Sequence, residues 1–152
     1  MDNKFDLKIN LKGIKHNPNG LSTGIIYFEY STEYFPRKDW NDFLDVILNW
    51  WMEELVLNLK LKKNKFDFQF MDGSYKLEMD FNSADICHIN ALSNDIKVFE
   101  KVIDMKLESF LVSFSRAIRE LIEFYEESKY RNEETEKLIE NFQKLNCLVN
   151  SR

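Results

Sequence analysis

Apolar residues occupy every second position from Phe5 to Leu11, with charged or amide residues between them. This two-residue period is typical of a strand with one buried face, and it predicts a strand that runs to about His16. A turn should follow at Asn17–Gly20, because Pro fixes φ and Asn or Gly tolerates positive φ. The alternating run from Gly24 to Phe35 predicts a second strand, which should pair with the first as a hairpin.

The apolar residues between Lys38 and Leu59 recur every three or four positions, which predicts a helix after Pro36. Trp40 and Trp51 fit the core side of this helix, and Trp50 is expected to be the more exposed of the tryptophans. Polar and acidic residues fall on the side opposite to the apolar arc. We expect this acidic face to bind a partner, through Asp39, Asp42, Asp45, Asn49, Trp50 and Glu53.

The segment from Phe66 to Phe81 predicts a second hairpin, because Asp72-Gly73 favours a two-residue type I′ turn between two alternating runs. Pairing outward from this turn places apolar residues opposite apolar residues on one face and polar opposite polar on the other. The expected pairs are Met71 with Ser74, Phe70 with Tyr75, Gln69 with Lys76, Phe68 with Leu77, Asp67 with Glu78, Phe66 with Met79 and Lys65 with Asp80.

Two more strands are expected at 86–92 and 96–103, across a turn at 93–95, although residues 96–104 could instead begin the next helix. Helical spacing predicts one helix from about Met105 to Ser128 and another that begins near Asn132 and ends near Cys147. Asn132 is suited to be the N-cap of this last helix, with two glutamates in its first turn.

The elements therefore follow the order ββαββββαα in a single domain that covers residues 1–152. Short connections favour antiparallel neighbours, and strands with one polar and one apolar face need cover on one side only. The expected fold is an α+β two-layer sandwich, with an antiparallel sheet of about six strands and the helices on one face.

Charge and composition argue against several classes of partner and location. The net charge of −5, with dispersed lysines, argues against nucleic acid as a partner. The N-terminal segment lacks the pattern of a signal peptide, and no apolar run approaches the roughly 18 residues that a membrane span needs. We therefore expect a cytoplasmic protein with no membrane partner, whose two cysteines are reduced thiols.

Candidate catalytic and metal-ligating residues are few. The chain contains two histidines, His16 and His88, and two cysteines, Cys87 and Cys147, without the paired spacings of a zinc site. Cys87 and His88 are adjacent and would point to opposite faces of a strand, so they would not act together. Phosphate-binding, dinucleotide-binding and hydrolase motifs are absent. We expect no catalytic residues, no metal and no cofactor.

The segment YFPRKDWNDFLDVILNWWMEEL at 34–55, followed by FMDGSY at 70–75, resembles small bacterial proteins of unassigned activity, some of which are associated with polymorphic-toxin immunity. The resemblance implies a cytoplasmic, non-catalytic protein that neutralises a toxin by binding it. An acidic helix face would complement the basic surface that a toxin acting on nucleic acid needs. The resemblance assigns no functional residue.

Two other functions stay open at this point. The surplus of aromatic residues is compatible with a small-molecule-binding or enzymatic domain that has a pocket between sheet and helices. The last helix or an exposed sheet edge could instead pair with its copy in a homo-oligomeric structural protein. The oligomeric state and the identity of a protein partner do not follow from the sequence.

Overall fold

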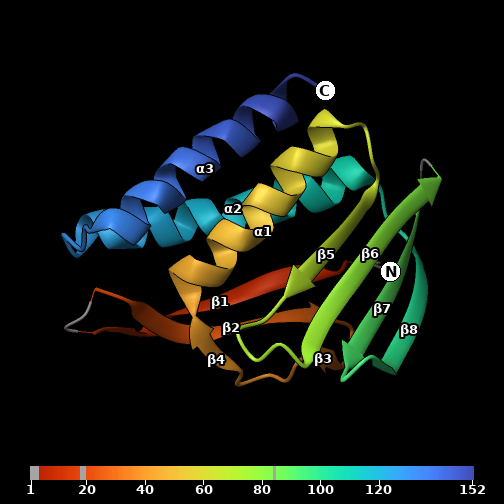
Figure 1. Ribbon diagram of the computed structural model, residues 1–152, viewed down its shortest axis with the longest axis horizontal. Coiled ribbons are helices and arrows are strands. Elements are labelled where there is room, and N and C mark those ends of the chain that lie inside the picture. Colours follow the sequence, from red (N-terminus) through yellow and green to blue (C-terminus); the bar gives the residue numbers. More distant parts are fainter. Residues whose placement is uncertain (1–3, 18–19, 84) are drawn as a thin grey trace.

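The computed structural model describes residues 4–17, 20–83 and 85–152 of the protein. Pro18 and Asn19 of the predicted first turn lie outside these residues. Along the described chain, four strands and one helix are followed by four strands and two helices (Figure 1). Their order is β1 (Asp6–His16), β2 (Ser22–Tyr30), β3 (Glu33–Phe35), β4 (Asn41–Phe43), α1 (Leu44–Lys60), β5 (Lys65–Gln69), β6 (Tyr75–Ser83), β7 (Ile86–Ser93), β8 (Ile96–Asp104), α2 (Leu107–Glu127) and α3 (Glu133–Asn150).

The strands form two antiparallel sheets of four strands each. The first sheet has the order β1-β2-β3, with β4 also paired to β2, and the second has the order β5-β6-β7-β8. The α+β class and the antiparallel pairing are confirmed, but the single sheet of about six strands is wrong. The chain leaves the first sheet through α1 before the second sheet begins, and each sheet is completed by strands that are neighbours in sequence.

The predicted strand from Gly24 to Phe35 is divided in two. Ser31 has a φ of 55°, which lies in the left-handed region, and the chain turns back there so that Tyr30 pairs with Glu33. The predicted helix from Lys38 also begins later, at Leu44, because residues 41–43 form β4 and pair with β2. Both errors have one cause, since backbone pairing with β2 replaces the local preference of these short segments.

The predicted register of the second hairpin is confirmed for its five strand pairs, from Gln69↔Lys76 out to Lys65↔Asp80. Its turn is different from the prediction. The Tyr75 amide donates to the Asp72 carbonyl over 3.0 Å, so Gly73 and Ser74 occupy the corners. Gly73 does not have a positive φ, and the Ser74 amide also donates to the Asp72 carboxylate. An Asx-turn thus replaces the type I′ turn, while the apolar pattern keeps the register.

The predicted elements of the second half of the chain agree closely with the structure. Residues 96–104 form β8 and not a helical turn. Asn132 is the N-cap of α3, where its side chain accepts from the Thr135 amide and the Thr135 hydroxyl accepts from the Asn132 amide. The helix continues three residues past the predicted end, to Asn150.

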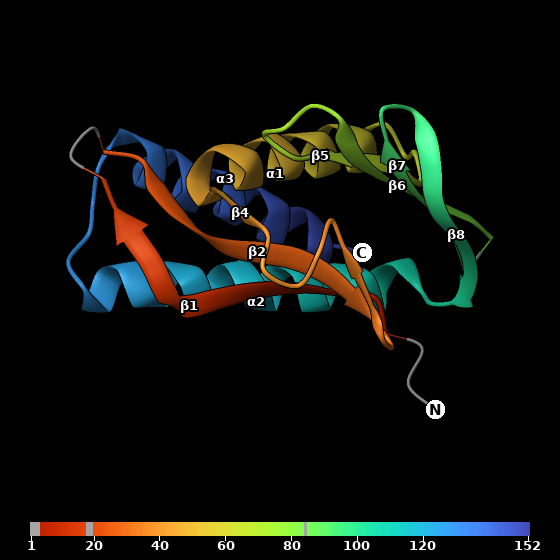
Figure 2. The same cartoon turned by 90° about the horizontal axis from the view of Figure 1, so that it is seen from below.

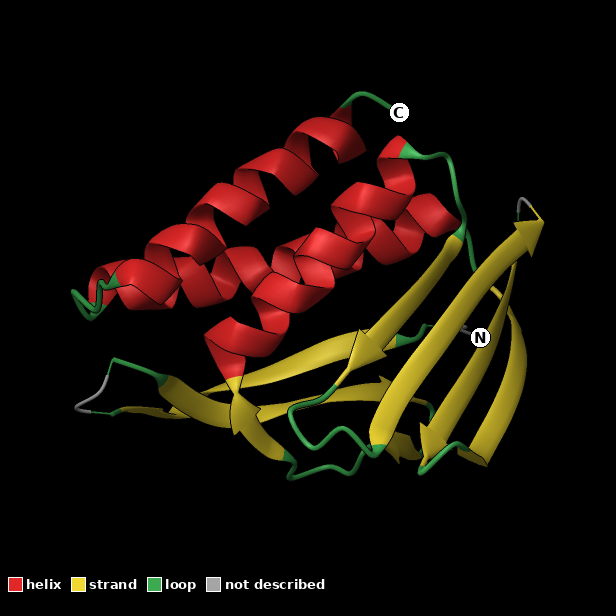
Figure 3. Cartoon of the chain, viewed as in Figure 1, coloured by secondary structure: helices red, strands yellow, loops and turns green. Residues whose placement is uncertain are grey.

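The three helices lie side by side, and the two sheets enclose them from below and from one flank in the view of Figure 3. Figure 2 views the molecule from below, where β1 and β2 run along the lower face of the helices, with α2 packed on β1 and α1 on β2. One core connects all of these elements. Phe28 of β2 contacts Trp51 of α1 at 5.4 Å and Phe68 of β5 at 5.7 Å between ring centroids. None of the described helices is both long and apolar enough to cross a membrane.

Candidate partner-binding face on α1

Helix α1 carries apolar residues on more than one side, and backbone hydrogen bonds close its C-terminal end. At its start the Asp42 carboxylate accepts from the Phe43 amide at 2.7 Å. At its end Lys62 adopts a φ of 57°, its amide donates to the Leu59 carbonyl, and the Lys63 amide donates to the Asn58 carbonyl. This is a Schellman termination achieved without glycine. The C-terminal end of α1 is therefore closed by backbone hydrogen bonds.

Asp42, which the sequence placed on an exposed acidic face, is 4% exposed. It precedes the helix, in β4, and its Oδ2 accepts from the Trp40 indole at 2.8 Å and from the Met71 amide at 3.2 Å. The carboxylate thus joins β4 to the turn of the second hairpin. Its hydrogen bonds explain why a buried acidic residue is tolerated there.

Asp45 lies in the first turn of α1 and is 1% exposed. Its Oδ1 accepts from the Tyr125 hydroxyl at 2.6 Å, its Oδ2 accepts from the Ser22 hydroxyl at 3.2 Å, and the two hydroxyl oxygens lie 2.6 Å apart. Burial raises the pKa of Asp45 to about 6, against the opposing effect of these hydrogen bonds. Burial, together with the neighbouring Asp45 carboxylate, also raises the pKa of Tyr125.

Asn49 and Glu53 continue the same side of α1 toward α3. Asn49 is 1% exposed, donates to the Glu134 carboxylate at 3.2 Å and accepts from the Asn141 amide nitrogen at 3.0 Å. Glu53 is half exposed and forms an ion pair of 3.4 Å with Lys137. Asp45, Asn49 and Glu53 therefore form a polar seam, in which α1 contacts the C-terminal end of α2 and the first half of α3.

The predicted acidic helix face is corrected by this arrangement. Asp42, Asp45 and Asn49 are buried, and Asp39 lies on the exposed loop before β4, where it pairs with Arg37 at 3.5 Å. Asp45, Asn49 and Glu53 do share one side of α1, but that side faces α3, and Asp39 and Asp42 precede the helix. Of the six residues, Asp39, Trp50 and Glu53 have exposed side chains, and their partner-binding role stays a prediction.

The side of α1 that does face water carries large apolar residues. Trp50 is 42% exposed, Leu57 56% and Leu61 55%, at spacings of seven and four residues along one stripe. Glu53 and Glu54 flank this stripe. We call Trp50, Glu53, Glu54, Leu57 and Leu61 the α1 outer face. The sequence reasoning missed both leucines, although their spacing from Trp50 was visible and a helix apolar on two sides indicates a second contact.

The remaining chemistry-bearing residues do not converge on a reactive site in the described part of the chain. Cys87 is buried, which raises the pKa of its thiol to about 12, so it is present as the neutral thiol. His16 stacks on Tyr130 with ring centroids 3.8 Å apart. Among the described residues, no group of three or more histidines, cysteines and carboxylates is placed to hold a metal ion.

The Ser22–Asp45–Tyr125 cluster contains a hydroxyl beside a carboxylate, as a nucleophilic site would. Ser22 is only 1% exposed, however. Asp45, which would have to accept the proton of the Ser22 hydroxyl, is buried as well. A substrate would have no access to the hydroxyl oxygen. The cluster is explained by its structural role, which is to connect β2, α1 and α2.

Comparisons of this chain with protein-family models, curated proteins and solved structures find no match.

Proposed function

We propose that this protein is a non-catalytic protein-binding module and that it contacts its partner through the α1 outer face. The observation that carries the proposal is the exposed stripe of Trp50, Leu57 and Leu61 on a helix whose other sides are already packed. Tryptophan is enriched among residues that dominate binding energy, because a large ring becomes buried with little loss of conformational freedom.

The charges around the stripe indicate the chemistry of the partner. Glu53 and Glu54 lie beside the apolar residues. The Glu53 carboxylate pairs with the Lys137 ammonium, and the Glu54 carboxylate accepts from the Asp67 amide. A basic partner surface would gain complementary charge at the rim and apolar contact at the centre. We therefore propose a basic protein domain as the partner.

Toxin immunity is the biological role that best combines these features. A toxin domain that acts on nucleic acid needs a basic surface, and a small protein that covers this surface would neutralise it without chemistry of its own. The resemblance of residues 34–55 and 70–75 to proteins associated with immunity supports this role. Under this proposal the two glutamates increase the association rate, and the apolar residues slow dissociation.

The proposal is tested by co-expression with a toxin domain encoded beside this protein's gene, with bacterial growth as the readout. Wild-type protein should restore growth, whereas Leu57→Lys and Trp50→Ala should reduce the protection. The matched control is Ile96→Lys on β8, which introduces the same charge at a residue that is 71% exposed and remote from α1 in sequence. Equal protection by all variants would show that the α1 outer face is not the binding surface.

A binding measurement with the purified domains separates the two contributions. Glu53→Lys combined with Glu54→Lys should lower the association rate several-fold at low salt and have little effect at high salt, because rim charges act mainly through long-range attraction. An unchanged association rate at low salt would show that the partner surface is not basic. The apolar contact would still be tested by the Leu57 and Trp50 variants.

A further inference from the structure

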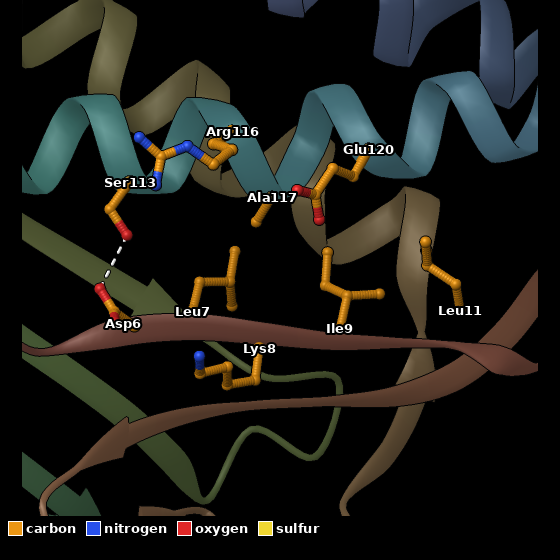
Figure 4. A pocket seen from close by; sticks show the side chains of 9 residues that line it. All are labelled: Asp6, Leu7, Lys8, Ile9, Leu11, Ser113, Arg116, Ala117 and Glu120. Atoms are coloured by element: carbon orange, nitrogen blue, oxygen red, sulfur yellow. Dashed lines mark hydrogen bonds between the residues drawn. The ribbon is translucent and has the colours of Figure 1, made fainter.

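A surface groove lies between β1 and α2, and it shares no residue with the α1 outer face. It consists of two adjoining cavities of about 200 Å³ and about 390 Å³, both lined by Asp6, Ser113 and Arg116. Figure 4 shows the smaller cavity, with Leu7, Ile9 and Leu11 pointing from β1 toward α2 and with Arg116 and Glu120 on the helix above them. We call the two cavities together the β1–α2 groove.

The strand that lines this groove has an unpaired edge. β1 is the terminal strand of the first sheet, and in the described part of the chain its ladder is formed with β2 alone. The pairing is regular from Asp6 to Asn10 and is interrupted only beyond that point. In an antiparallel ladder every second residue directs its N–H and C=O away from its partner strand, so this segment offers backbone donors and acceptors to an added strand.

The side chains of the groove are partly apolar and partly charged. Ile9, Leu11 and Ala117 are half-buried and line the smaller cavity, whereas Phe110, Met105 and Val112 line the larger one. Arg116 and Glu120 are exposed, and within the described part of the chain the side chain of neither forms an ion pair or a hydrogen bond. Asp6 is already engaged, since it accepts from the Ser113 hydroxyl at 2.8 Å.

We propose that the β1–α2 groove binds an extended peptide, which adds antiparallel to β1 as a new edge strand. Arg116 and Glu120 are one helical turn apart, or about 6 Å along the axis, and two residues of a strand span about 6.6 Å. An acidic residue at Arg116 and a basic residue at Glu120 would therefore lie two positions apart in the peptide. This charge complementarity, together with the free edge, defines the partner as an extended segment.

The direction of the added strand fixes the order of its residues. β1 runs from the Arg116 end of the groove toward the Glu120 end, as Figure 4 shows, so an antiparallel peptide runs the opposite way. From its N-terminus, the peptide then places a basic side chain opposite Glu120, an acidic one opposite Arg116 and an apolar one in the larger cavity beside Val112. The recognised pattern is basic-x-acidic-x-apolar.

Two peptides of identical composition test this proposal. Acetyl-Thr-Lys-Thr-Glu-Thr-Leu-Thr-amide has the proposed order, and acetyl-Thr-Glu-Thr-Lys-Thr-Leu-Thr-amide has the two charges exchanged. Titration followed by amide chemical shifts should show the first peptide binding about fivefold more tightly, as two exposed ion pairs provide. The largest shifts should fall on the amides of residues 6–10. Binding of neither peptide at millimolar concentration, or equal binding of both, would overturn the proposal.

A charge exchange in the protein provides the reciprocal test. The double variant Arg116→Glu with Glu120→Arg should prefer the second peptide, and both residues are exposed, so the variant should fold. The matched control is Glu140→Lys with Lys144→Glu, which exchanges an exposed pair of the same spacing on α3 and should keep the wild-type preference. An unchanged preference in the groove variant would show that these charges do not read the peptide.

Backbone methylation then tests strand addition itself. In an added strand only alternate peptide amides donate to β1. N-methylation of one alternate set of amides should abolish binding, and N-methylation of the other set should be tolerated. Equal effects of the two sets would exclude strand addition.

Discussion

Two sides of α1 contrast, because polar residues are buried on one of them and apolar residues are exposed on the other. The side that contacts α2 and α3 carries Asp45 and Asn49, both 1% exposed, whereas the side that faces water carries Trp50 and Leu57 with about half of their surface exposed. Polar residues are tolerated inside because each one has hydrogen-bond partners from another element. The exposed apolar residues have no comparable explanation within the chain, which is why we attribute a binding role to them.

The largest expected effect comes from Asp42, which is buried although it lies in a strand that the sequence read as helix. Asp42→Ala should lower the free energy of unfolding by about 3 kcal/mol, because it leaves the Trp40 indole and the Met71 amide without their acceptor. Urea unfolding measures this loss. Asp39→Ala is the control, and it should change the free energy by less than about 0.5 kcal/mol because its ion pair is exposed.

The second prediction concerns the pH dependence of stability at Asp45. Its pKa is about 6 in the folded protein, above the model-compound value of 3.8, so the folded state binds the proton more tightly than the unfolded state. The contribution of this group is fully present below pH 3.8, and about 3 kcal/mol of it is lost as pH rises to about 6. The contacts agree, because the Asp45 carboxyl group and the two hydroxyl groups make three contacts, and all three can hold a hydrogen only when Asp45 is protonated.

Asp45→Asn isolates this effect, since other groups also titrate between pH 4 and 6. The stability of the wild-type protein relative to the variant should fall across this window, as measured by urea unfolding at a series of pH values. A difference that is flat with pH would show that Asp45 is ionised in the fold with an ordinary pKa.

A smaller effect on stability is expected at Tyr125, which donates the hydrogen bond to Asp45. Tyr125→Phe removes the hydroxyl that donates to Asp45 at 2.6 Å, and it should lower the free energy of unfolding by about 1–2 kcal/mol. Because this hydrogen bond lowers the pKa of Asp45, the variant should raise that pKa further. The pH-dependent loss of stability should then extend above pH 6. A window unchanged from that of the wild type would contradict the role assigned to Tyr125.

The smallest effects on stability should occur on the α1 outer face. Leu57→Lys should change the free energy of unfolding by less than about 0.5 kcal/mol, because the side chain is already 56% exposed. Thermal unfolding beside Ile96→Lys checks this expectation. A loss above 1 kcal/mol in the Leu57 variant alone would show that the residue supports the fold, and it would weaken the evidence for a binding face.

The second hairpin shows how much a local pattern can predict. Phe66, Phe68, Leu77 and Met79 share one face, and a shift of one residue would expose all of them, so the register follows from the sequence. The turn was less determined, because Asp72 can hydrogen-bond to the backbone through its own carboxylate. The N-cap at Asn132 was equally local and was predicted, whereas the return hydrogen bond to Thr135 was not.

The polar stripe of α1 could not be assigned from its spacing. A helical period of three to four residues shows that Asp45, Asn49 and Glu53 share a side, but it does not show what covers that side. These residues contact Tyr125, Asn141 and Lys137. The contact of Asp45 with Tyr125 spans 80 positions of the sequence, and that of Asn49 with Asn141 spans 92. Only the packing of α2 and α3 against α1 brings them together.

The sequence by itself determined the α+β class, the antiparallel pairing and the register of the second hairpin, because these depend on periodic patterns and neighbouring segments. The tertiary structure decided which polar residues are buried, where the strands divide into two sheets and which apolar residues are left on the surface. The physical reason is that a hydrogen-bond partner distant in sequence can make a buried carboxylate acceptable, and hydrophobic patterning carries no information about such a partner.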